Sequence, residues 1–355
     1  MNDTDKTFLR SLLAAPGTSS FESRPAAVWR EAAQERGAET HTDGYGNTFA
    51  TFGKGGTPRV LLAGHVDEIG LLVTYIDDEG RLYFKGVGGW DSQQLVGQRV
   101  RVVGYKGELL GVIGKKPVHL MNTEDRRKVS KIEDMWIDIG AKDGAEAKQH
   151  VRAGDFAVIE QPVLELLNGR IVSKAIDNRI GAFIVLEAAR RATQEGSGSD
   201  AEVVAVATVQ EEIGGIGAYI ASNALQPDVA IAVDVTHATD IPNVSKKQEG
   251  ETSFGSGPEL TVGSYVHRGV LEMLRGAAER EDIPYSIGIS PRGTGTDADD
   301  LAKNRGGVPT AVVSIPNRYM HSPNEMIDPE DLENVIKLLA AFIQGLDREA
   351  AFVQP

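Results

Sequence analysis

The 355-residue sequence predicts an α/β fold, in which helices flank a mixed, largely parallel sheet and a small β-rich domain is inserted. Two observations predict this class. Four short apolar runs alternate with amphipathic helical patterns, which is typical of strands buried on both faces of a parallel sheet. Between the first and second of these runs, residues 70–165 instead carry short alternating strand patterns and little helix.

The α/β part begins and ends with helices. The chain opens with two helical patterns, residues 5–15 and 23–36, and Ser23 is expected to cap the second. Buried strands are expected at residues 59–65, 202–209, 229–233 and 310–315. Further helices are expected at residues 178–192, 214–224, 267–280 and 329–346. Because this alternation stops near residue 69 and resumes near residue 166, we expect residues 1–69 and 166–355 to form one domain.

The segment from residue 70 to residue 165 is expected to form the second, β-rich domain. Its strands are predicted at residues 71–76, 81–86, 98–105, 109–114 and 155–160. The charge-rich stretch 121–134 is expected to be a loop with a short helix.

The composition excludes several classes of protein. The chain has no cysteine, which rules out disulfides, thiolate nucleophiles and cysteine-ligated metals. Its 37 basic residues against 51 acidic residues give a net charge of −14, which argues against binding of nucleic acid. Neither a secretory signal nor an apolar stretch of about 18 residues is present, so we expect no membrane segment and a cytoplasmic location.

Histidine and acidic side chains follow each of the four buried runs. The residues concerned are His65 and Asp67, Glu211 and Glu212, Asp234, and His321 in the loop after the last run, with Asp177 opening a helix nearby. Because ligands of open α/β sheets bind at the carboxyl ends of the strands, we expect these side chains to converge on one rim. Clustered carboxylates repel one another, and a divalent metal removes that repulsion.

The donor types indicate the metal. Imidazole and carboxylate ligands suit a catalytic zinc or cobalt site. Five ligands are too many for one open tetrahedral site, and they suit two ions that share a carboxylate. Asp67 lies two residues after His65, so it could instead accept the second ring N–H of that histidine and fix its tautomer.

Several longer segments resemble those of family M42 metallo-aminopeptidases, the group of TET, glutamyl and lysyl aminopeptidases, some of which carry an endoglucanase label. The matching segments are AGHVDEIG (63–70), KPVHLM (116–121), KIEDMWIDIGA (131–141), SKAIDNRIGA (173–182), ATVQEEIGGIGA (207–218), DVTHATD (234–240), GTDADD (295–300) and IPNRYMHSPNEMI (315–327). They span most of the chain, and the resemblance implies a zinc-peptidase-like fold.

The resemblance implies that Asp177 bridges two divalent ions per subunit, zinc or cobalt. His65 and Asp234 would complete one metal site, and Glu212 and His321 would complete the other. The implied reaction is hydrolysis of the N-terminal peptide bond of peptides through a water molecule activated by the two metals.

Further roles follow from the same resemblance. Glu211 would be the general base, and Asp67 would orient His65. Thr296 and Asp297 would contact substrate, because the matching segment lies near the site in the family, or they would form an Asx or N-cap turn before residues 297–304. The inserted domain would mediate dimerisation, and family members typically assemble dimers into a dodecamer.

Three positions depart from the family pattern, namely Ile216, Ser256 and the pair Asp299-Asp300. None is a predicted metal ligand or the base, so the departures bear on specificity and assembly. If Asp299 and Asp300 line the pocket, they would favour basic substrate side chains.

Two alternative functions remain open. An N-acyl amino acid deacylase could use the same metal core on a different substrate. A glycoside hydrolase could use paired carboxylates, which must flank the scissile bond. Adjacent Glu211 and Glu212 would point in opposite directions on a strand, and only 6% of residues are aromatic, so the sequence favours this second alternative least.

Overall fold

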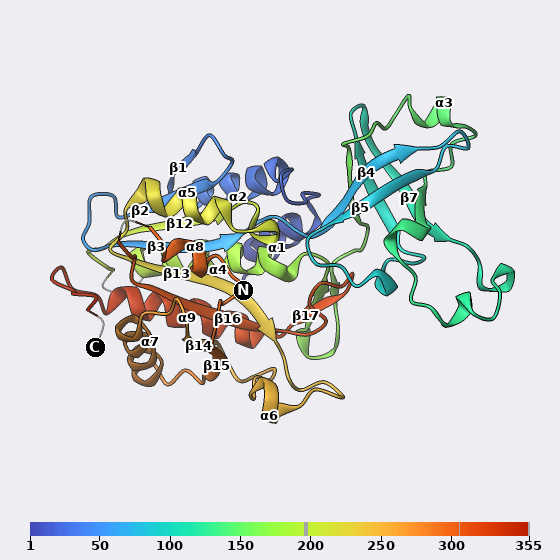
Figure 1. Ribbon diagram of the computed structural model, residues 1–355. Helices are drawn as coiled ribbons and strands as arrows, with labels where there is room; N and C mark the ends of the chain where they lie inside the picture. The colour runs from blue at the N-terminus through green and yellow to red at the C-terminus, as the bar shows by residue number, and fades with distance from the viewer. Residues whose placement is uncertain (195–197, 305, 354–355) are drawn as a thin grey trace.

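The computed structural model describes residues 1–194, 198–304 and 306–353, and it confirms the α/β class (Figure 1). An eight-stranded mixed sheet runs in the order β1-β2-β12-β3-β13-β16-β14-β15. Its strands are β1 (Glu39–Thr42), β2 (Thr48–Phe52), β3 (Arg59–His65), β12 (Glu202–Thr208), β13 (Val229–His237), β14 (Glu259–Gly263), β15 (Ser286–Ser290) and β16 (Thr310–Asn317).

The four predicted apolar runs are neighbours at the centre of this sheet. β12 and β13 both pair with β3 in parallel, and β13 pairs in parallel with β16. Every residue of β12 is buried, which explains the unbroken apolar pattern of that strand. Because all four strands point the same way, their carboxyl ends meet at one edge of the sheet.

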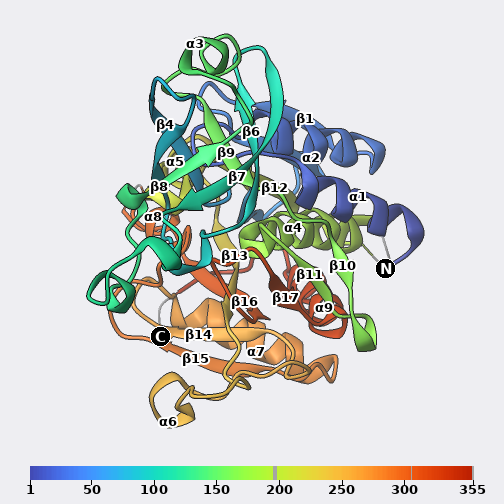
Figure 2. The ribbon, with the colours of Figure 1, turned by 90° about the vertical axis from the view of Figure 1, so that its right-hand side faces the viewer.

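Helices cover both faces of the sheet. Their bounds are α1 (Asp3–Ala14), α2 (Ser23–Glu35), α4 (Ile176–Gln194), α5 (Ile216–Leu225), α7 (Arg268–Arg280), α8 (Ala298–Leu301) and α9 (Pro329–Gln344), with a short α6 (Lys246–Glu249) outside the layers. Figure 2 shows α1, α4 and α9 on one side and α5 with α8 on the other. The main hydrophobic core lies between these helices and the sheet.

The segment with alternating strand patterns forms a closed antiparallel barrel in the order β4-β5-β8-β7-β6-β9. Its strands are β4 (Gly70–Ile76), β5 (Leu82–Val87), β6 (Arg99–Gly104), β7 (Gly107–Lys115), β8 (Met135–Asp138) and β9 (Phe156–Ile159), with α3 (Gly144–Ala147) before the last. The barrel has its own hydrophobic core and projects from one end of the α/β body (Figure 1). The domain boundaries predicted at residues 70 and 165 enclose it and stay a prediction.

A three-stranded antiparallel sheet, β10-β11-β17, lies beside the carboxyl-terminal edge of the large sheet. Its strands are β10 (Leu164–Glu165), β11 (Ile171–Ser173) and β17 (Glu325–Ile327), none longer than three residues. Strands this short carry no readable alternation, so the sequence did not predict this sheet. It joins the segment that leads into α4 to the segment that follows His321.

Other expectations differ in detail. Glu22 rather than Ser23 occupies the N-cap of α2, and the Glu22 side chain makes no capping hydrogen bond there. The charged stretch 121–134 is a loop with short helices, as expected, and these are two 3₁₀ turns, η3 (Asp125–Arg127) and η4 (Ile132–Asp134). The last two strands of the large sheet, β14 and the edge strand β15, and the barrel strand β8 were not predicted from the sequence. Among the described residues, no helix has both the length and the apolar character needed to cross a membrane.

Candidate metal centre

The site begins where β3 and α4 touch. A Cβ atom on Gly64 would lie 2.5 Å from the Gly181 carbonyl carbon, so only glycine allows the strand and helix backbones to approach this closely. At the start of α4, the Asn178 side chain donates to Val233 O of β13 at 2.7 Å. These contacts bring the start of α4 against the carboxyl ends of two neighbouring strands.

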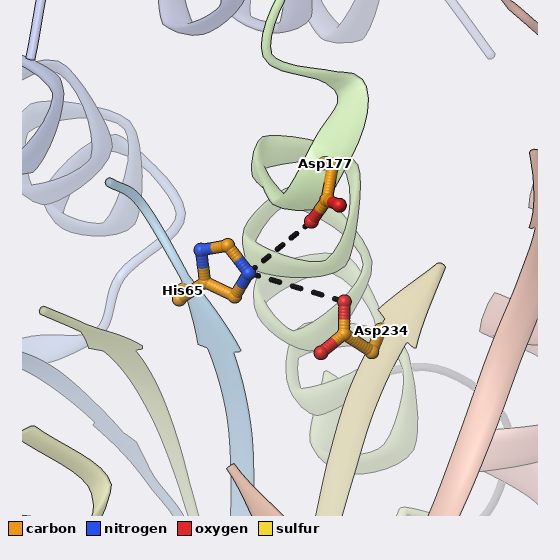
Figure 3. Close-up of side chains that lie close together, drawn as sticks. All are labelled: His65, Asp177 and Asp234. Carbon is orange, nitrogen blue, oxygen red and sulfur yellow. Dashed lines mark ion pairs between the residues drawn. The ribbon is translucent and has the colours of Figure 1, made fainter. Parts of the chain in front are cut away.

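The first predicted ligand group gathers at this point. His65 Nε2 lies 3.3 Å from Asp177 Oδ1 and 3.9 Å from Asp234 Oδ1 (Figure 3). All three residues are buried. Their ligand atoms lie within 4.8 Å of one another, which is close enough to surround one metal ion.

The second predicted ligand group shares Asp177 with the first. His321 Nε2 lies 3.3 Å from Asp177 Oδ2 and 3.3 Å from Glu212 Oε2. The two histidines therefore face opposite oxygens of one aspartate. This arrangement matches the prediction of two ions that share a carboxylate, while the number of ions stays a prediction.

Both histidines hold the tautomer that a metal ligand needs. His65 Nδ1 donates to the Asp67 main-chain oxygen at 3.1 Å, and His321 Nδ1 donates to Gly89 O at 2.8 Å. Since a carbonyl oxygen only accepts, Nδ1 of each ring carries a proton, and Nε2 is the nitrogen that faces the cluster and would bind a metal once it is deprotonated. Gly89 follows β5, so the barrel supplies part of the site.

The Asp67 carboxylate has a wider role than the sequence predicted. Its Oδ1 lies 3.4 Å from His65 Nδ1, but the shorter contact of that ring is to the main chain of Asp67. The carboxylate accepts from Glu211 N and Glu212 N, both at 3.2 Å, and from Ser19 Oγ at 2.8 Å. Asp67 therefore holds the backbone of the two glutamates.

Glu211 and Glu212 lie on a 3₁₀ turn, η6 (Glu211–Ile213), immediately after β12. The expectation that these side chains point in opposite directions on a strand is wrong, because the strand has ended and both side chains line the same cavity. Glu211 Oε2 lies 3.6 Å from His65 Nε2. Gln210, with φ of +59°, begins the turn in the left-handed region.

The electrostatics of the cluster fit a divalent cation. Burial raises the pKa of Glu211 to about 10, and it also raises the pKa values of Glu212 and Asp234. Hydrogen bonds with Asp177 and Glu212 raise the pKa of His321 to about 11. With protein groups alone, Glu211, Glu212 and Asp234 therefore favour their neutral form, whereas hydrogen bonds with His321 and His65 lower the pKa of Asp177. A divalent cation would keep the three raised carboxyls ionised. Among the described residues, Glu212 Oε1 has no hydrogen-bond partner although it is buried, as suits a ligand atom.

A cavity of about 580 Å³ opens from the cluster. Thr296, Asp299 and Asp300 line it, together with four of the five predicted metal ligands, namely Asp177, Glu212, Asp234 and His321. Asp297 is only 2% exposed and accepts a hydrogen bond from Thr208 Oγ1, so it lies in the wall behind Thr296. Substrate contact by Thr296 and Asp297 stays a prediction.

Two contributors to the site were missed in the sequence. Gly89 acts through its carbonyl oxygen, which leaves no signal in residue type or spacing. Glu325 accepts hydrogen bonds from the main chains of Asp177 and His321, and it lies inside the matching segment 315–327, four residues after His321. That proximity to a predicted ligand was the available signal.

Two imidazoles and several carboxylates around a shared aspartate, at the carboxyl edge of a parallel sheet and open to a cavity, define a metal-dependent hydrolase. The family model described as M42 glutamyl aminopeptidase matches residues 46–338. The chain belongs to the M42 family.

Individual proteins agree with this assignment. The chain is 36% identical to the lysyl aminopeptidase of Pyrococcus furiosus, over 96% of this chain and 97% of that one. The structure of a TET aminopeptidase from a marine Thaumarchaeota archaeon matches with a TM-score of 0.93 and 36% identity, over 97% of each chain. The TET1 peptidase of Pyrococcus horikoshii, described as assembling into a tetrahedron or a large octahedral shell, matches with a TM-score of 0.83 and 32% identity, over 96% of this chain and 100% of that one.

Proposed function

We propose that this M42 protein, a metal-dependent aminopeptidase, hydrolyses the N-terminal peptide bond of peptides with two divalent cations and with Glu211 as general base. One observation carries the proposal: His65 and His321 each place Nε2 3.3 Å from a different oxygen of Asp177. A carboxylate approached from both sides by imidazoles is suited to bridge two ions.

The donor set decides which ions fit. His65 and Asp234 would hold one ion, Glu212 and His321 would hold the other, and Asp177 would bridge them. Nitrogen and oxygen donors without thiolate favour zinc or cobalt. Three ligand carboxylates against two divalent ions leave a net charge of about +1, which is low enough to be held in a buried site. When bound, the ions would polarise the scissile carbonyl and lower the pKa of a water molecule toward neutrality.

Glu211 is the residue best placed to move the proton. Its side chain lines the cavity and lies 3.6 Å from His65 Nε2, on the edge of the first ligand group. Glu211 N donates to Asp67 at 3.2 Å, and this contact fixes the backbone from which the Glu211 side chain enters the cavity. The proposal assigns Glu211 to proton transfer and not to metal binding. Glu211 would accept the proton of the attacking water and pass it to the leaving amine.

The charges around the cavity favour a free N-terminus over an acylated one. A substrate α-amine is positively charged near neutral pH. Glu211, Asp299 and Asp300 line the cavity, and their carboxylates outnumber the one lysine among the described residues of its lining, Lys303, which pairs with Asp300 at 3.3 Å. An N-acyl group carries no charge for them, so aminopeptidase activity is favoured over the deacylase alternative.

Chelation followed by metal addition tests the proposal. We expect chelated protein to lose the release of an aminoacyl chromophore, and zinc or cobalt to restore it with about two ions bound per chain. Glu211→Gln should lower kcat by at least about 100-fold and retain metal, because the base is lost and the ligands remain. Glu79→Gln, in an exposed turn of the barrel, is the matched control.

Three results would count against the proposal. Metal-independent turnover would contradict the metal centre, and loss of metal in Glu211→Gln would make this residue a ligand. Faster hydrolysis of N-acetylated amino acids than of free aminoacyl substrates would favour the deacylase.

We also propose that the chain forms a homo-oligomer, with the barrel as dimerisation domain and a dodecamer as the assembled state. The barrel and its long loop carry exposed apolar side chains that an interface would cover, namely Leu110, Val112, Val118, Leu120 and Val129. Light scattering after size exclusion should give a mass of about twelve chains, and a monomeric mass would refute this assembly. The cytoplasmic location stays a prediction.

A further inference from the structure

Glu325 joins the two halves of the candidate metal centre. It is the first residue of β17 and lies beside Ser173 of β11 in the small antiparallel sheet. Its Oε2 accepts from Asp177 N at 3.0 Å, and its Oε1 accepts from His321 N at 2.8 Å. One carboxylate thus receives the main-chain N–H groups of two predicted ligands that come from distant parts of the chain.

We propose that Glu325 is a positioning residue for this centre, holding the shared ligand Asp177 and the terminal ligand His321 in the relative arrangement that two metal ions require. The inference rests on the proposed two-metal function. It concerns a residue that touches no substrate and acts through the ligands.

The backbone at the His321 contact needs external support, and the N–H of Asp177 needs an acceptor outside the helix. His321 has φ of +57°, in the left-handed region that is costly for a residue with a side chain. Asp177, with φ of −70° and ψ of 108°, departs from helical geometry although it stands at the start of α4. A hydrogen bond to a fixed acceptor stabilises each of these conformations, and Glu325 supplies both acceptors.

The chemistry of the contact calls for a carboxylate. Two N–H donors meet two different oxygens, and an ionised glutamate only accepts. A glutamine at position 325 would accept one hydrogen bond and present its NH₂ group to the other N–H donor. A carboxylate at position 325 can therefore accept both N–H groups, whereas an amide of the same size can accept only one.

Glu325 is buried at this position. Its side chain is 2% exposed, and burial raises the pKa of its carboxyl group well above the usual value. Both carboxyl oxygens accept main-chain N–H groups of predicted ligands, so a change at this position acts on Asp177 and His321.

Zinc titration by calorimetry into metal-free protein tests the inference without relying on activity. We expect Glu325→Gln to bind at least one of the two ions 10–100-fold more weakly than the wild type. At saturating zinc, kcat should fall by a similar factor while KM changes little, because the substrate cavity is untouched. Glu330→Gln, an exposed change in the first turn of α9, should bind both ions as the wild type does.

Several outcomes would overturn the proposal. Glu325→Gln that binds both ions with wild-type affinity would overturn it. If this variant also loses the same number of degrees in melting temperature with and without zinc, the role of Glu325 is purely structural. If the wild type itself binds no zinc, the proposed function fails instead, and the two failures are thereby distinguished.

Two further measurements apply if Glu325→Gln does not fold. Glu325→Asp keeps the charge but is one methylene shorter, so it should lose one contact and show a smaller loss of zinc affinity. In the wild type, the amides of Asp177 and His321 should exchange slowly with deuterium because Glu325 accepts both. Fast exchange of these two amides, or undiminished affinity in Glu325→Asp, would refute the reasoning.

Discussion

Asp67→Asn tests whether Asp67 holds the 3₁₀ turn that carries Glu211 and Glu212. In the structure the Asp67 carboxylate accepts from Glu211 N, Glu212 N and Ser19 Oγ. Asparagine has nearly the same shape, but one of its two terminal atoms is an NH₂ donor. In either orientation of the amide, one of the two main-chain N–H groups of the turn faces a donor and loses its acceptor.

The magnitude follows from that single lost contact. A hydrogen bond to a charged acceptor contributes about 1.5–3 kcal/mol, and an orphaned buried N–H costs about 1–3 kcal/mol. Displacement of Glu211 or Glu212 should raise the activation free energy by about 1.4–2.8 kcal/mol of this cost, and kcat/KM then falls 10–100-fold. Stability should fall by about 1–3 kcal/mol for the same reason.

Steady-state kinetics on an aminoacyl substrate at saturating zinc is the assay, with bound metal measured on the same samples. Ser19→Ala removes one partner of Asp67 but leaves both N–H contacts of the turn, so it should lower kcat/KM much less. A value for Asp67→Asn within twofold of the wild type would refute the reasoning. A loss in Ser19→Ala as large as that in Asp67→Asn would also contradict it.

Two further substitutions test the packing and the charge of the fold. Gly64→Ala should destabilise the protein by more than about 2 kcal/mol, because the new methyl group would meet the Gly181 backbone at 2.5 Å. Gly276→Ala is the control. Position 276 lies in α7 with open space around it, so this change should raise the melting temperature slightly. Equal melting temperatures for the two variants would contradict the close approach of β3 and α4. Burial raises the pKa of Asp331 from 3.8 to about 6, so its protonation stabilises the folded state below pH 4 and this contribution is lost as the pH rises through 6. Asp331→Asn carries a constant cost at every pH, because the amide offers only one acceptor to Gly255 N and Gly257 N. The stability difference between variant and wild type should nevertheless shift in favour of the variant by roughly 1–2 kcal/mol from pH 4 to pH 7 in urea denaturation, and a difference that does not change with pH would show that the carboxyl is not perturbed.

The four central strands and their membership of a largely parallel sheet could be predicted from the sequence, because burial on both faces leaves an unbroken apolar run. β3, β12, β13 and β16 each carry such a run, and parallel strands bring their carboxyl ends to one edge. The candidate ligands follow from the same logic, since each stands at or just after the end of a run or at the start of the helix between them. Strands without a periodic signal, such as β10, β11 and β17, could not be predicted.

The candidate metal ligands could be predicted from the sequence as one group, whereas the contacts that hold them in place follow from the folded structure. His65, Asp177 and Asp234 are placed by local strand and helix patterns, which depend on residues near them in the chain. The carbonyl of Gly89 on His321 and the carboxylate of Glu325 across two ligands are contacts between segments far apart in sequence. Such contacts depend on the packing of the barrel and the small sheet against the α/β body, and neither residue type nor periodicity encodes that packing locally.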